Sequence, residues 1–362
     1  MARVIGIDPG TVSLDICGLD AGRVFLDETI PTEDALADPS LIVGLIERAA
    51  PIDLVVGPSG YGLPLTNARD LTESDIRLAC LAPRGESSGI GGLSSLMRAL
   101  AASPAPVVMT PGVIHLTSVP AHRKINRVDM GTADKVCAVA LAIHEQTRRR
   151  SCSPRDVSFM LLELGGAFTA AVAVEEGRIV DGLGGSSGPM GAMASGSLDG
   201  EVAFLAGEVT KRMIFSGGAL AVAGTPDARA ETVADVTTPA RQRALEGYLE
   251  SVVKAVASLT ISAPSARAVV LSGRLARVPT IRGGLMSRLA RLLPGGAVET
   301  LTGPATTAKH AAQGAAILAD GLAGGGAAEL VETLGIRTAT GTVLDHLFVI
   351  SPEAARQRLG IE

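Results

Sequence analysis

The chain has 362 residues, enough for two domains of ordinary size, each with its own hydrophobic core. Its 47% hydrophobic content excludes a disordered chain, and a net charge of −5 with only 2% aromatic residues argues against a nucleic-acid-binding surface. No apolar run reaches membrane-spanning length and the four cysteines (Cys17, Cys80, Cys137 and Cys152) lack metal-ligand spacing, so we expect a cytoplasmic protein with reduced thiols and no membrane partner.

The first half of the chain alternates between strand-like and helix-like patterns. Apolar alternation over residues 3–30 predicts a meander of three strands. Helices are predicted at 41–49, 93–100 and 132–147, and short buried strands at 53–57 and 106–111. The strand at 53–57 is expected to be parallel, after a crossover helix, and a turn-rich run at 58–64 follows it. A polar run at 148–154 breaks the pattern, so the first domain is predicted to cover residues 1–150.

The second half begins with another meander and becomes largely helical. Strands are predicted within 157–183, at 268–271 and at 297–301, and helices at 199–206, 210–214, 239–261, after Pro279 and at 307–322. Three glycines at 324–326 separate this second domain, residues 151–325, from a tail of residues 326–362. The tail is predicted to form a helix, a strand at 343–350 and another helix, and to pack back on the first domain.

One arrangement of strands and turns occurs twice, about half a chain apart. The first turn of each meander contains glycine, in DPGT (8–11) and in ELGGAFT (163–169). The second turn of each has the pattern xxGR, at 20–23 and at 175–178. An internal duplication of this kind predicts two similar α/β domains whose first turns face a shared cleft.

The first turn contains groups that can bind phosphate and metal ions. Gly10 and Thr11 can present backbone N–H groups and a hydroxyl to phosphate oxygens. Asp8, at the end of a buried strand, can hold Mg²⁺ directly or through water. Glu163, in the second turn, is either another Mg²⁺ ligand or a hydrogen-bonded structural carboxylate. The alternative for the first turn is an Asp-Pro-Gly turn without a ligand.

The second turn and a third segment make the phosphate interpretation more specific. The second turn contributes Gly165, Gly166 and Thr169. Two such turns can hold a polyphosphate from both sides. The third segment follows a buried strand and opens towards a helix, where small residues allow a nucleoside to approach; it consists of Ser272, Gly273 and Arg274.

These segments resemble the nucleotide-binding motifs of the acetate and sugar kinase/Hsp70/actin superfamily. The likeness to its phosphate-1, phosphate-2 and adenosine motifs lies in GIDPGT (6–11), LELGGAFT (162–169) and VVLSGRLA (269–276). Its two interdomain helices are similar to GTADKVCAVALAI (131–143) and GAAILADGL (314–322).

Within the superfamily, the likeness is greatest to butyrate and acetate kinases. GRIVDGLGGSSGPMG (177–191) is similar to the segment that follows their second phosphate turn. VVGPSGYGLPL (55–65) and RVDMGTADK (127–135) resemble an uncharacterised branch described as predicted butyrate kinases.

The resemblance implies an actin-like ATPase fold, with a ribonuclease-H-like sheet in each of two duplicated domains and an interdomain cleft. It also implies ATP, Mg²⁺, domain closure and transfer of the γ-phosphoryl group to a small-molecule acceptor, a carboxylate in this branch. A homodimer is implied because carboxylate kinases of the family are commonly dimers. The acceptor is expected between two groups of residues: Ser59, Gly60 and Tyr61 on one side, and Ser186, Ser187 and Gly188 on the other.

Four further charged residues are candidates for the transfer itself. Arg84 and Arg127 would neutralise the transferring phosphoryl group, or else both are solvated. Asp129 and Asp134 would position the metal or the acceptor. The alternative for Asp134 is a charge pair with Lys135 or Arg127 on a helix surface.

Two other functions stay open. One is a non-catalytic ATP-binding sensor or switch, which is favoured by two departures from the family. Glu163 stands where the acetate kinase branch usually has His, and Thr110 stands where butyrate kinases carry an acid. The other is a kinase of a specialised biosynthetic intermediate with a hydroxyl acceptor.

Overall fold

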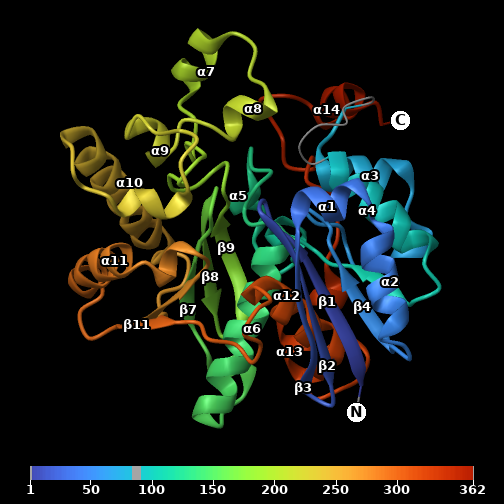
Figure 1. Cartoon of the computed structure of the whole chain (residues 1–362). Helices are drawn as coiled ribbons and strands as arrows, with labels where there is room; N and C mark the ends of the chain where they lie inside the picture. The colour runs from blue at the N-terminus through green and yellow to red at the C-terminus, as the bar shows by residue number, and fades with distance from the viewer. Residues whose placement is uncertain (1, 84–90, 362) are drawn as a thin grey trace.

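The structure is a computed structural model that describes residues 2–83 and 91–361. Two sheets lie side by side, with helices between them and on their outer faces (Figure 1). Within the described residues, no helix is both long and apolar enough to cross a lipid bilayer.

The first sheet has the strand order β3-β2-β1-β4-β6-β5. Its strands are β1 (Arg3–Pro9), β2 (Ser13–Asp20), β3 (Arg23–Pro31), β4 (Leu54–Gly57), β5 (Thr66–Asn67) and β6 (Val107–Met109). The strands β1, β2 and β3 form an antiparallel meander, whereas β4 is parallel to β1 and β6 is parallel to β4. The predicted parallel strand at 53–57 is therefore confirmed.

The second sheet has the strand order β11-β10-β7-β8-β9. Its strands are β7 (Phe159–Leu164), β8 (Thr169–Glu175), β9 (Arg178–Leu183), β10 (Ala268–Ser272) and β11 (Ala297–Thr300). The strands β9, β8, β7, β10 and β11 repeat the order and the directions of β3, β2, β1, β4 and β6. The internal duplication predicted from the two meanders is confirmed.

The second turn of each meander has the same backbone conformation. The central residues have positive φ angles of 50° and 77° at Ala21 and Gly22, and of 50° and 72° at Glu176 and Gly177. Consecutive positive φ angles define the type I′ turn that suits a two-residue hairpin, and glycine occupies its second position at the lowest steric cost. The xxGR pattern therefore reports a real structural repeat.

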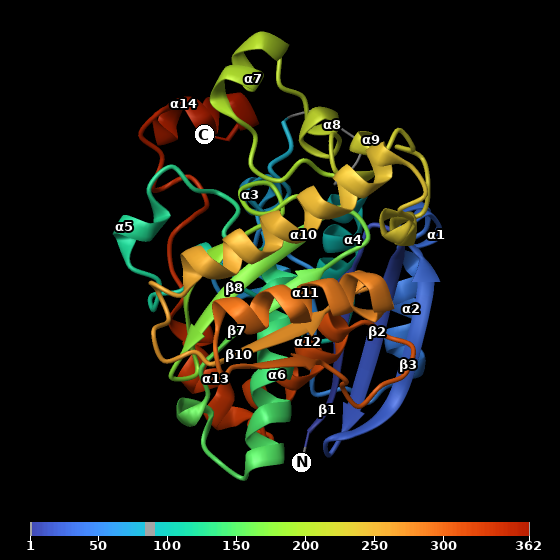
Figure 2. The ribbon, with the colours of Figure 1, turned by 90° about the vertical axis from the view of Figure 1, so that its left-hand side faces the viewer.

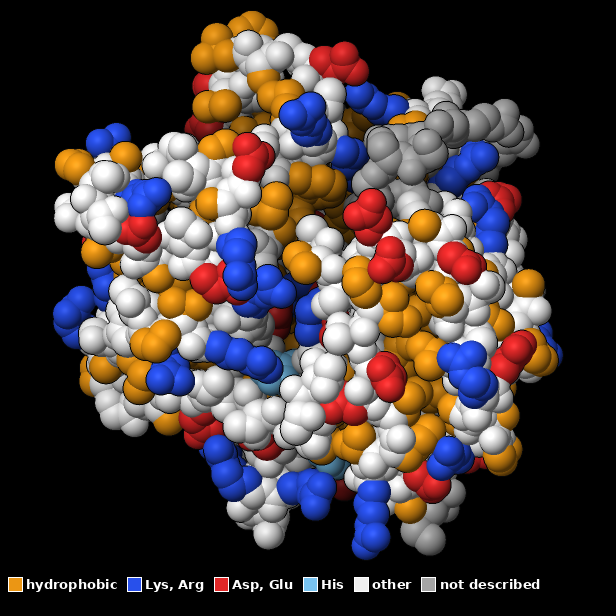
Figure 3. Space-filling model, viewed as in Figure 1, with side chains coloured by type: hydrophobic (Ala, Val, Ile, Leu, Met, Phe, Trp, Pro, Cys, Tyr) orange, Lys and Arg blue, Asp and Glu red, His pale blue; other side chains and the backbone are white. Residues whose placement is uncertain are grey.

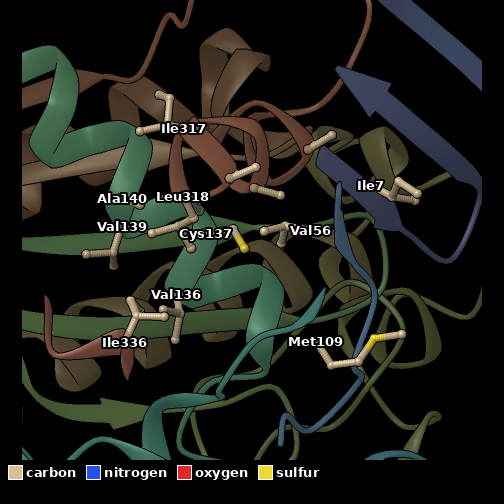
Figure 4. Packing of buried hydrophobic residues seen from close by; sticks show 14 of the residues in the cluster. Ile7, Val56, Met109, Val136, Cys137, Val139, Ala140, Ile317, Leu318 and Ile336 are labelled. Carbon is tan, nitrogen blue, oxygen red and sulfur yellow. The ribbon is translucent and has the colours of Figure 1, made fainter. Parts of the chain in front are cut away.

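Two helices lie between the sheets: α6 (Ala133–Arg150) and α12 (His310–Leu322) (Figures 1 and 2). Glycine allows the close approach of α12, because a Cβ atom on Gly6 would overlap the backbone of Ala316. A Cβ atom on Gly314 would likewise overlap the backbone of Cys137 in α6. Figure 4 shows the apolar side chains of α6, α12 and the first sheet packed together in this core.

Other helices cover the outer faces and the ends of the sheets. In the first half these are α1 (Thr32–Ala37), α2 (Ser40–Arg48), α3 (Glu73–Cys80), α4 (Gly91–Ala102) and α5 (Ala121–Lys124). In the second half they are α7 (Gly200–Ala206), α8 (Lys211–Ile214), α9 (Ala219–Val222), α10 (Pro239–Leu259), α11 (Pro279–Leu292), α13 (Ala328–Leu334) and α14 (Pro352–Leu359). The long helices α10 and α11 cover the outer face of the second sheet with a separate hydrophobic cluster (Figure 2).

Short 3₁₀ helices join several of these elements. They span Ala68–Asp70, Val113–His115, Pro154–Asp156, Ala230–Ala234, Leu275–Arg277 and Ile336–Thr338. The predicted domain boundaries stay predictions. The helix α12, which the prediction assigned to the second domain, packs on β1 of the first sheet.

The strand predicted at 343–350 is wrong, because this segment forms turns. The N–H groups of Phe348 and Val349 donate to the side-chain oxygen of Asn126, at 2.7 and 3.0 Å, so they take part in no strand ladder. The side chains of Phe348 and Val349 are 72% and 88% exposed. The end of the tail lies against the first half of the chain, where the Arg77 guanidinium also donates to the Gly360 carbonyl, whereas α13 also contacts β9 of the second sheet.

Candidate nucleotide-binding site

A cavity of about 810 Å³ is lined by residues from both halves of the chain. Figure 3 shows a hollow near the centre of the molecule, bordered by Lys and Arg side chains. The predicted site residues that line the cavity are Asp8, Gly10, Thr11, Ser59, Gly60, Tyr61, Asp129, Asp134, Glu163, Gly165, Gly166, Ser186, Ser272, Gly273 and Arg274. The fold thus brings most of the sequence-predicted site into one place.

The first turns of the two meanders match in their hydrogen bonding. The N–H of Gly10 donates to the Ser13 carbonyl, and the N–H of Gly165 donates to the Phe168 carbonyl, both at 2.9 Å. By this hydrogen bond, Gly10 corresponds to Gly165 and Thr11 to Gly166. Residues of both turns line the cavity.

The matching turns correct the prediction for Thr169, which does not line the cavity. Thr169 occupies the position in the second meander that Leu14 occupies in the first, and Leu14 is buried within β2. The Thr169 side chain is fully buried, with its hydroxyl 3.3 Å from the Tyr248 hydroxyl on α10. Thr169 therefore packs inside the second half and does not face a phosphate.

Asp8 ends the buried strand β1 and is only 6% exposed. Burial raises its pKa to about 7, and the nearby carboxylates of Asp134 and Asp15 add to the rise. The ammonium groups of Lys309 and Lys135 act in the opposite direction. The two ammonium groups therefore do not offset the combined effect of burial and the neighbouring carboxylates on the pKa of Asp8.

Asp134 forms an ion pair with its neighbour Lys135 at the start of α6. Burial acts to raise the pKa of Asp134, but the Lys135 ammonium and a hydrogen bond from the Thr132 hydroxyl lower it overall. The ion pair between Asp134 and Lys135, which the sequence offered as an alternative, is confirmed. The pair does not lie on an open helix surface. Both side chains line the cavity and are only 30% and 15% exposed.

Glu163 ends β7 at the place that Asp8 occupies in β1. Burial raises the pKa of Glu163, while Lys135 and the Ser272 hydroxyl lower it in part. The Ser272 hydroxyl also lies 2.7 Å from Nδ1 of His310, whose pKa burial lowers to about 4. His310 is therefore neutral near pH 7, and Glu163 belongs to a buried polar network.

Lys309 immediately precedes α12 and reaches the first turn. Its ammonium lies 2.9 Å from both the Ser13 carbonyl oxygen and Oδ2 of Asp15. A Cβ atom on Gly10 would overlap this ammonium, so a side chain at position 10 would displace Lys309. The Lys309 side chain is 38% exposed and lines the cavity.

Sequence reasoning missed Lys309 as a site residue and treated Lys135 only as a charge partner. Both lysines stand at the first turn of a helix that resembles an interdomain helix. In a duplicated fold the starts of these two helices meet at the cleft. This placement could have predicted that both lysines lie in the site.

Asp129 holds the loop that carries Ser186. Its Oδ2 accepts hydrogen bonds of 3.0 Å from both the N–H and the hydroxyl of Ser186, and its Oδ1 accepts one from Gly131. The Ser187 hydroxyl donates to the Asp129 backbone carbonyl. Asp129 therefore positions this loop, although its side chain also reaches the cavity.

The remaining predicted residues are placed differently. Arg127 does not line the cavity, and its guanidinium donates to the Ser187 carbonyl at 3.3 Å. Ser187 and Gly188 also lie outside the lining, and their carbonyls accept hydrogen bonds from Ser197. Arg84 lies outside the described residues.

The residues at the first turn fit a magnesium ion. Among the described residues, no group of three or more His, Cys, Asp or Glu side chains is arranged to hold a metal ion. Magnesium needs fewer protein ligands, because it commonly binds one or two carboxylates together with phosphate oxygens and water. Asp8 fits this role. A cation beside its carboxylate would offset both the cost of burying that charge and the repulsion from neighbouring carboxylates, which together raise its pKa.

Solved structures with a similar fold include acetate and propionate kinases. An acetate kinase from Entamoeba histolytica is 13% identical with a TM-score of 0.60, covering 83% of this chain and 96% of that chain. A propionate kinase from Francisella tularensis subsp. tularensis SCHU S4 is 14% identical with a TM-score of 0.60, covering 87% and 99%. The Porphyromonas gingivalis acetate kinase is 14% identical with a TM-score of 0.57, covering 81% and 88%.

These likenesses confirm the predicted fold, the duplicated actin-like ATPase fold of acetate and sugar kinases. No curated protein sequence matches the chain. A family model described as "Protein of unknown function (DUF1464)" matches residues 6–349, and the chain therefore belongs to that family.

Proposed function

We propose that the protein is an ATP-dependent kinase that transfers the γ-phosphoryl group to a small-molecule carboxylate. One observation carries the proposal: two glycine turns with matching hydrogen bonds line a single cavity together with Asp8, Lys135 and Lys309. The kinase-like fold supports phosphoryl transfer as the reaction class. The carboxylate acceptor rests on the resemblance to butyrate kinases.

The glycine turns would hold the phosphates of ATP from both sides. Backbone N–H groups near Gly10 and Gly166 suit phosphate oxygens because they carry no side chain that blocks the approach. The nucleoside would lie near Gly273, which has a φ of +88° and, lacking a Cβ atom, packs closely against the backbone of Leu164 at the end of β7. Lys309 would contribute the positive charge at the first turn.

Asp8 would hold Mg²⁺ beside the β- and γ-phosphates, with Glu163 as a second carboxylate near the same place. The bound ion would supply neutralisation of phosphate charge. Asp8 must lose its proton to act as a ligand, so a pKa near 7 couples metal binding to pH.

During transfer, an acceptor oxygen would attack the γ-phosphorus, and the bond from the γ-phosphorus to the β,γ-bridging oxygen would break. ADP would leave with the electron pair of that bond. Lys135 would stabilise the charge on the phosphoryl oxygens, since preorganised cations act strongly in a site that excludes water. Asp134 would hold the Lys135 ammonium in place.

A carboxylate acceptor needs no general base, because it is already ionised near neutral pH. A hydroxyl acceptor would need one. Asp134 is poorly suited to that task, since its pKa is lowered and its carboxylate is engaged by Lys135 and Thr132. Asp134 is therefore not the base that a hydroxyl acceptor would need.

The test is to incubate the protein with MgATP, candidate acids and hydroxylamine. A carboxylate kinase yields ADP together with a hydroxamate, because hydroxylamine traps an acyl phosphate but not a phosphate ester. ADP without hydroxamate, in the presence of alcohols, would indicate a hydroxyl acceptor. Tight ATP binding with no acceptor-dependent ADP would indicate the sensor or switch.

A further inference from the structure

Aromatic side chains are scarce in this protein, yet they gather in the cavity. The chain has six Phe, two Tyr and no Trp. Three of these eight side chains line the cavity: Tyr61, Phe168 and Phe215. The hollow in Figure 3 has hydrophobic side chains in its upper part.

These rings belong to two apolar walls, one from each half of the chain. The first wall consists of Tyr61 and the nearby Leu36 and Leu93. The second consists of Phe168, Phe215 and Met193. The rings of Phe168 and Phe215 pack edge to face, with centroids 5.1 Å apart and planes at 86°.

The two walls approach each other at α8. The Lys211 ammonium, from the second half, lies 5.2 Å from the centroid of the Tyr61 ring. Met193 remains 41% exposed although it lines the cavity. A cavity with apolar walls from both halves leaves hydrophobic surface in contact with water until a ligand covers it.

The apolar walls are continuous with the expected acceptor residues. Tyr61 directly follows Ser59 and Gly60, and the Asp129 charge contributes to raising its pKa after the larger effect of burial. Asp129 also holds Ser186, and a Cβ atom on the preceding Gly185 would lie 2.6 Å from the Phe168 ring. The walls therefore lie beside the acceptor rather than at the adenosine segment.

We infer that the acceptor carries a bulky apolar body, an aromatic ring or a medium-length acyl chain, larger than acetate or propionate. This inference rests on the proposed kinase function. Each methylene group that enters an apolar pocket increases affinity by about fourfold. An acid with only one or two carbons beyond its carboxylate would leave both walls uncovered.

The first experiment compares straight-chain acids from acetate to hexanoate, together with phenylacetate, as acceptors with MgATP. The expected result is a kcat/KM that rises about fourfold per added methylene. The same series is also titrated without nucleotide, and the alcohols 1-hexanol and 2-phenylethanol are included. If both kcat/KM and affinity stay constant or fall for acids longer than propionate, the inference is overturned.

The second experiment uses Phe215→Ala, with Phe215→Leu to retain bulk and the exposed Phe348→Ala as a matched control. Phe215→Ala is expected to lower kcat/KM, or affinity, for phenylacetate at least tenfold. The kcat/KM or affinity for acetate and the dissociation constant for ATP should each change less than twofold. If Phe215→Ala weakens the binding of ATP as strongly as the binding of phenylacetate, the ring belongs to the nucleoside site and the inference is wrong.

The two proposals fail in distinguishable ways. If the wild-type protein binds hexanoate far better than acetate but binds no ATP, the proposed kinase function is contradicted and the inference of an apolar pocket stands. A wild-type protein that binds ATP but prefers acetate would contradict only the pocket.

Discussion

Asp8, Asp134 and Glu163 share one small region with two lysines. Lys135 acts on all three acids, and Lys309 acts on Asp8 and Glu163. The two lysines do not offset burial at Asp8 and Glu163, because both carboxyl groups keep raised pKa values. In the proposed kinase, Mg²⁺ would add positive charge here when a polyphosphate enters.

Asp8→Asn should stabilise the protein above about pH 7 and abolish turnover. The pKa of Asp8 rises from 3.8 to about 7 on folding, so between these values the folded protein holds a proton that the unfolded chain has lost. Stability from this proton is fully present below about pH 4 and is lost as pH rises to about 7. Urea denaturation at several pH values should therefore show a steeper loss of stability in the wild type than in the variant.

Asp70→Asn, an exposed surface change, serves as the matched control and should keep the wild-type pH dependence. If Asp8→Asn and Asp70→Asn give identical stability curves, burial does not raise the pKa of Asp8.

Lys309→Met is expected to weaken ATP and ADP binding by about 10- to 100-fold and to change AMP binding far less. A charge-assisted hydrogen bond to phosphate contributes about 1.5–3 kcal/mol, which accounts for this range. Calorimetry with the three nucleotides checks the result, with Lys309→Arg as the conservative variant. Lys254→Met, at a lysine that pairs only with Glu250 on the surface of α10, is the control.

A purely structural role for Lys309 predicts another result. Its pair with Asp15 ties α12 to β2, so its loss would lower the melting temperature without discriminating between AMP and ATP.

The sequence predicts Asp8, both glycine turns and the adenosine segment because each follows a strand whose apolar pattern is unambiguous. It does not predict that Lys309 reaches Gly10, since almost 300 residues separate them and only the packing of α12 on β1 joins them. The role expected for Thr169 failed because Thr169 is the first residue of β8, at the place of Leu14 in the first meander, whereas Thr11 lies within the first turn.

The segment that leads into α12 is fastened to the first sheet by one carboxylate. Asp27 of β3 accepts hydrogen bonds from the N–H groups of Thr306, Thr307 and Ala308 and from the Thr306 hydroxyl. Burial acts to raise the pKa of Asp27, but these donors lower it overall. The contact fixes the start of α12 and hence the position of Lys309.

Asp27→Ala is expected to lower the free energy of unfolding by about 1–3 kcal/mol near neutral pH, because several N–H donors lose their acceptor. Since folding lowers the pKa of Asp27, its contribution is present above about pH 4 and is lost as pH falls through the folded value. Urea denaturation at pH 7 and pH 3 should therefore show a smaller difference at pH 3. Glu28→Ala, at the exposed neighbouring position, should change stability at neither pH.

Patterns of apolar residues predict most helices and strands here, but they fail at 343–350. Val343, Leu344 and Leu347 suggest a strand, whereas in the structure Asn126 binds the backbone N–H groups that a strand would use. This side chain lies more than 200 residues away, and Asp345 within the segment also accepts hydrogen bonds from Thr342. Local pattern contains no information about such a partner.

The duplication gives the molecule two equivalent turn positions on the two sides of a single cavity. The two turns have since diverged, with Asp8 and Lys309 at the first and Glu163, Ser272 and His310 at the second. A symmetric scaffold with unlike chemical groups suits an asymmetric ligand such as a nucleoside triphosphate, whose phosphates and nucleoside need different surroundings. In the proposed function, the two halves would therefore bind MgATP together.

Calorimetric titration with ATP and a non-hydrolysable ATP analogue, with and without Mg²⁺, is the direct test of this binding. We expect one site per chain, binding that tightens strongly with Mg²⁺, and loss of the Mg²⁺ effect in a folded Asp8→Ala variant. Absence of binding by the wild type, or binding that is indifferent to both Mg²⁺ and Asp8→Ala, would contradict this expectation.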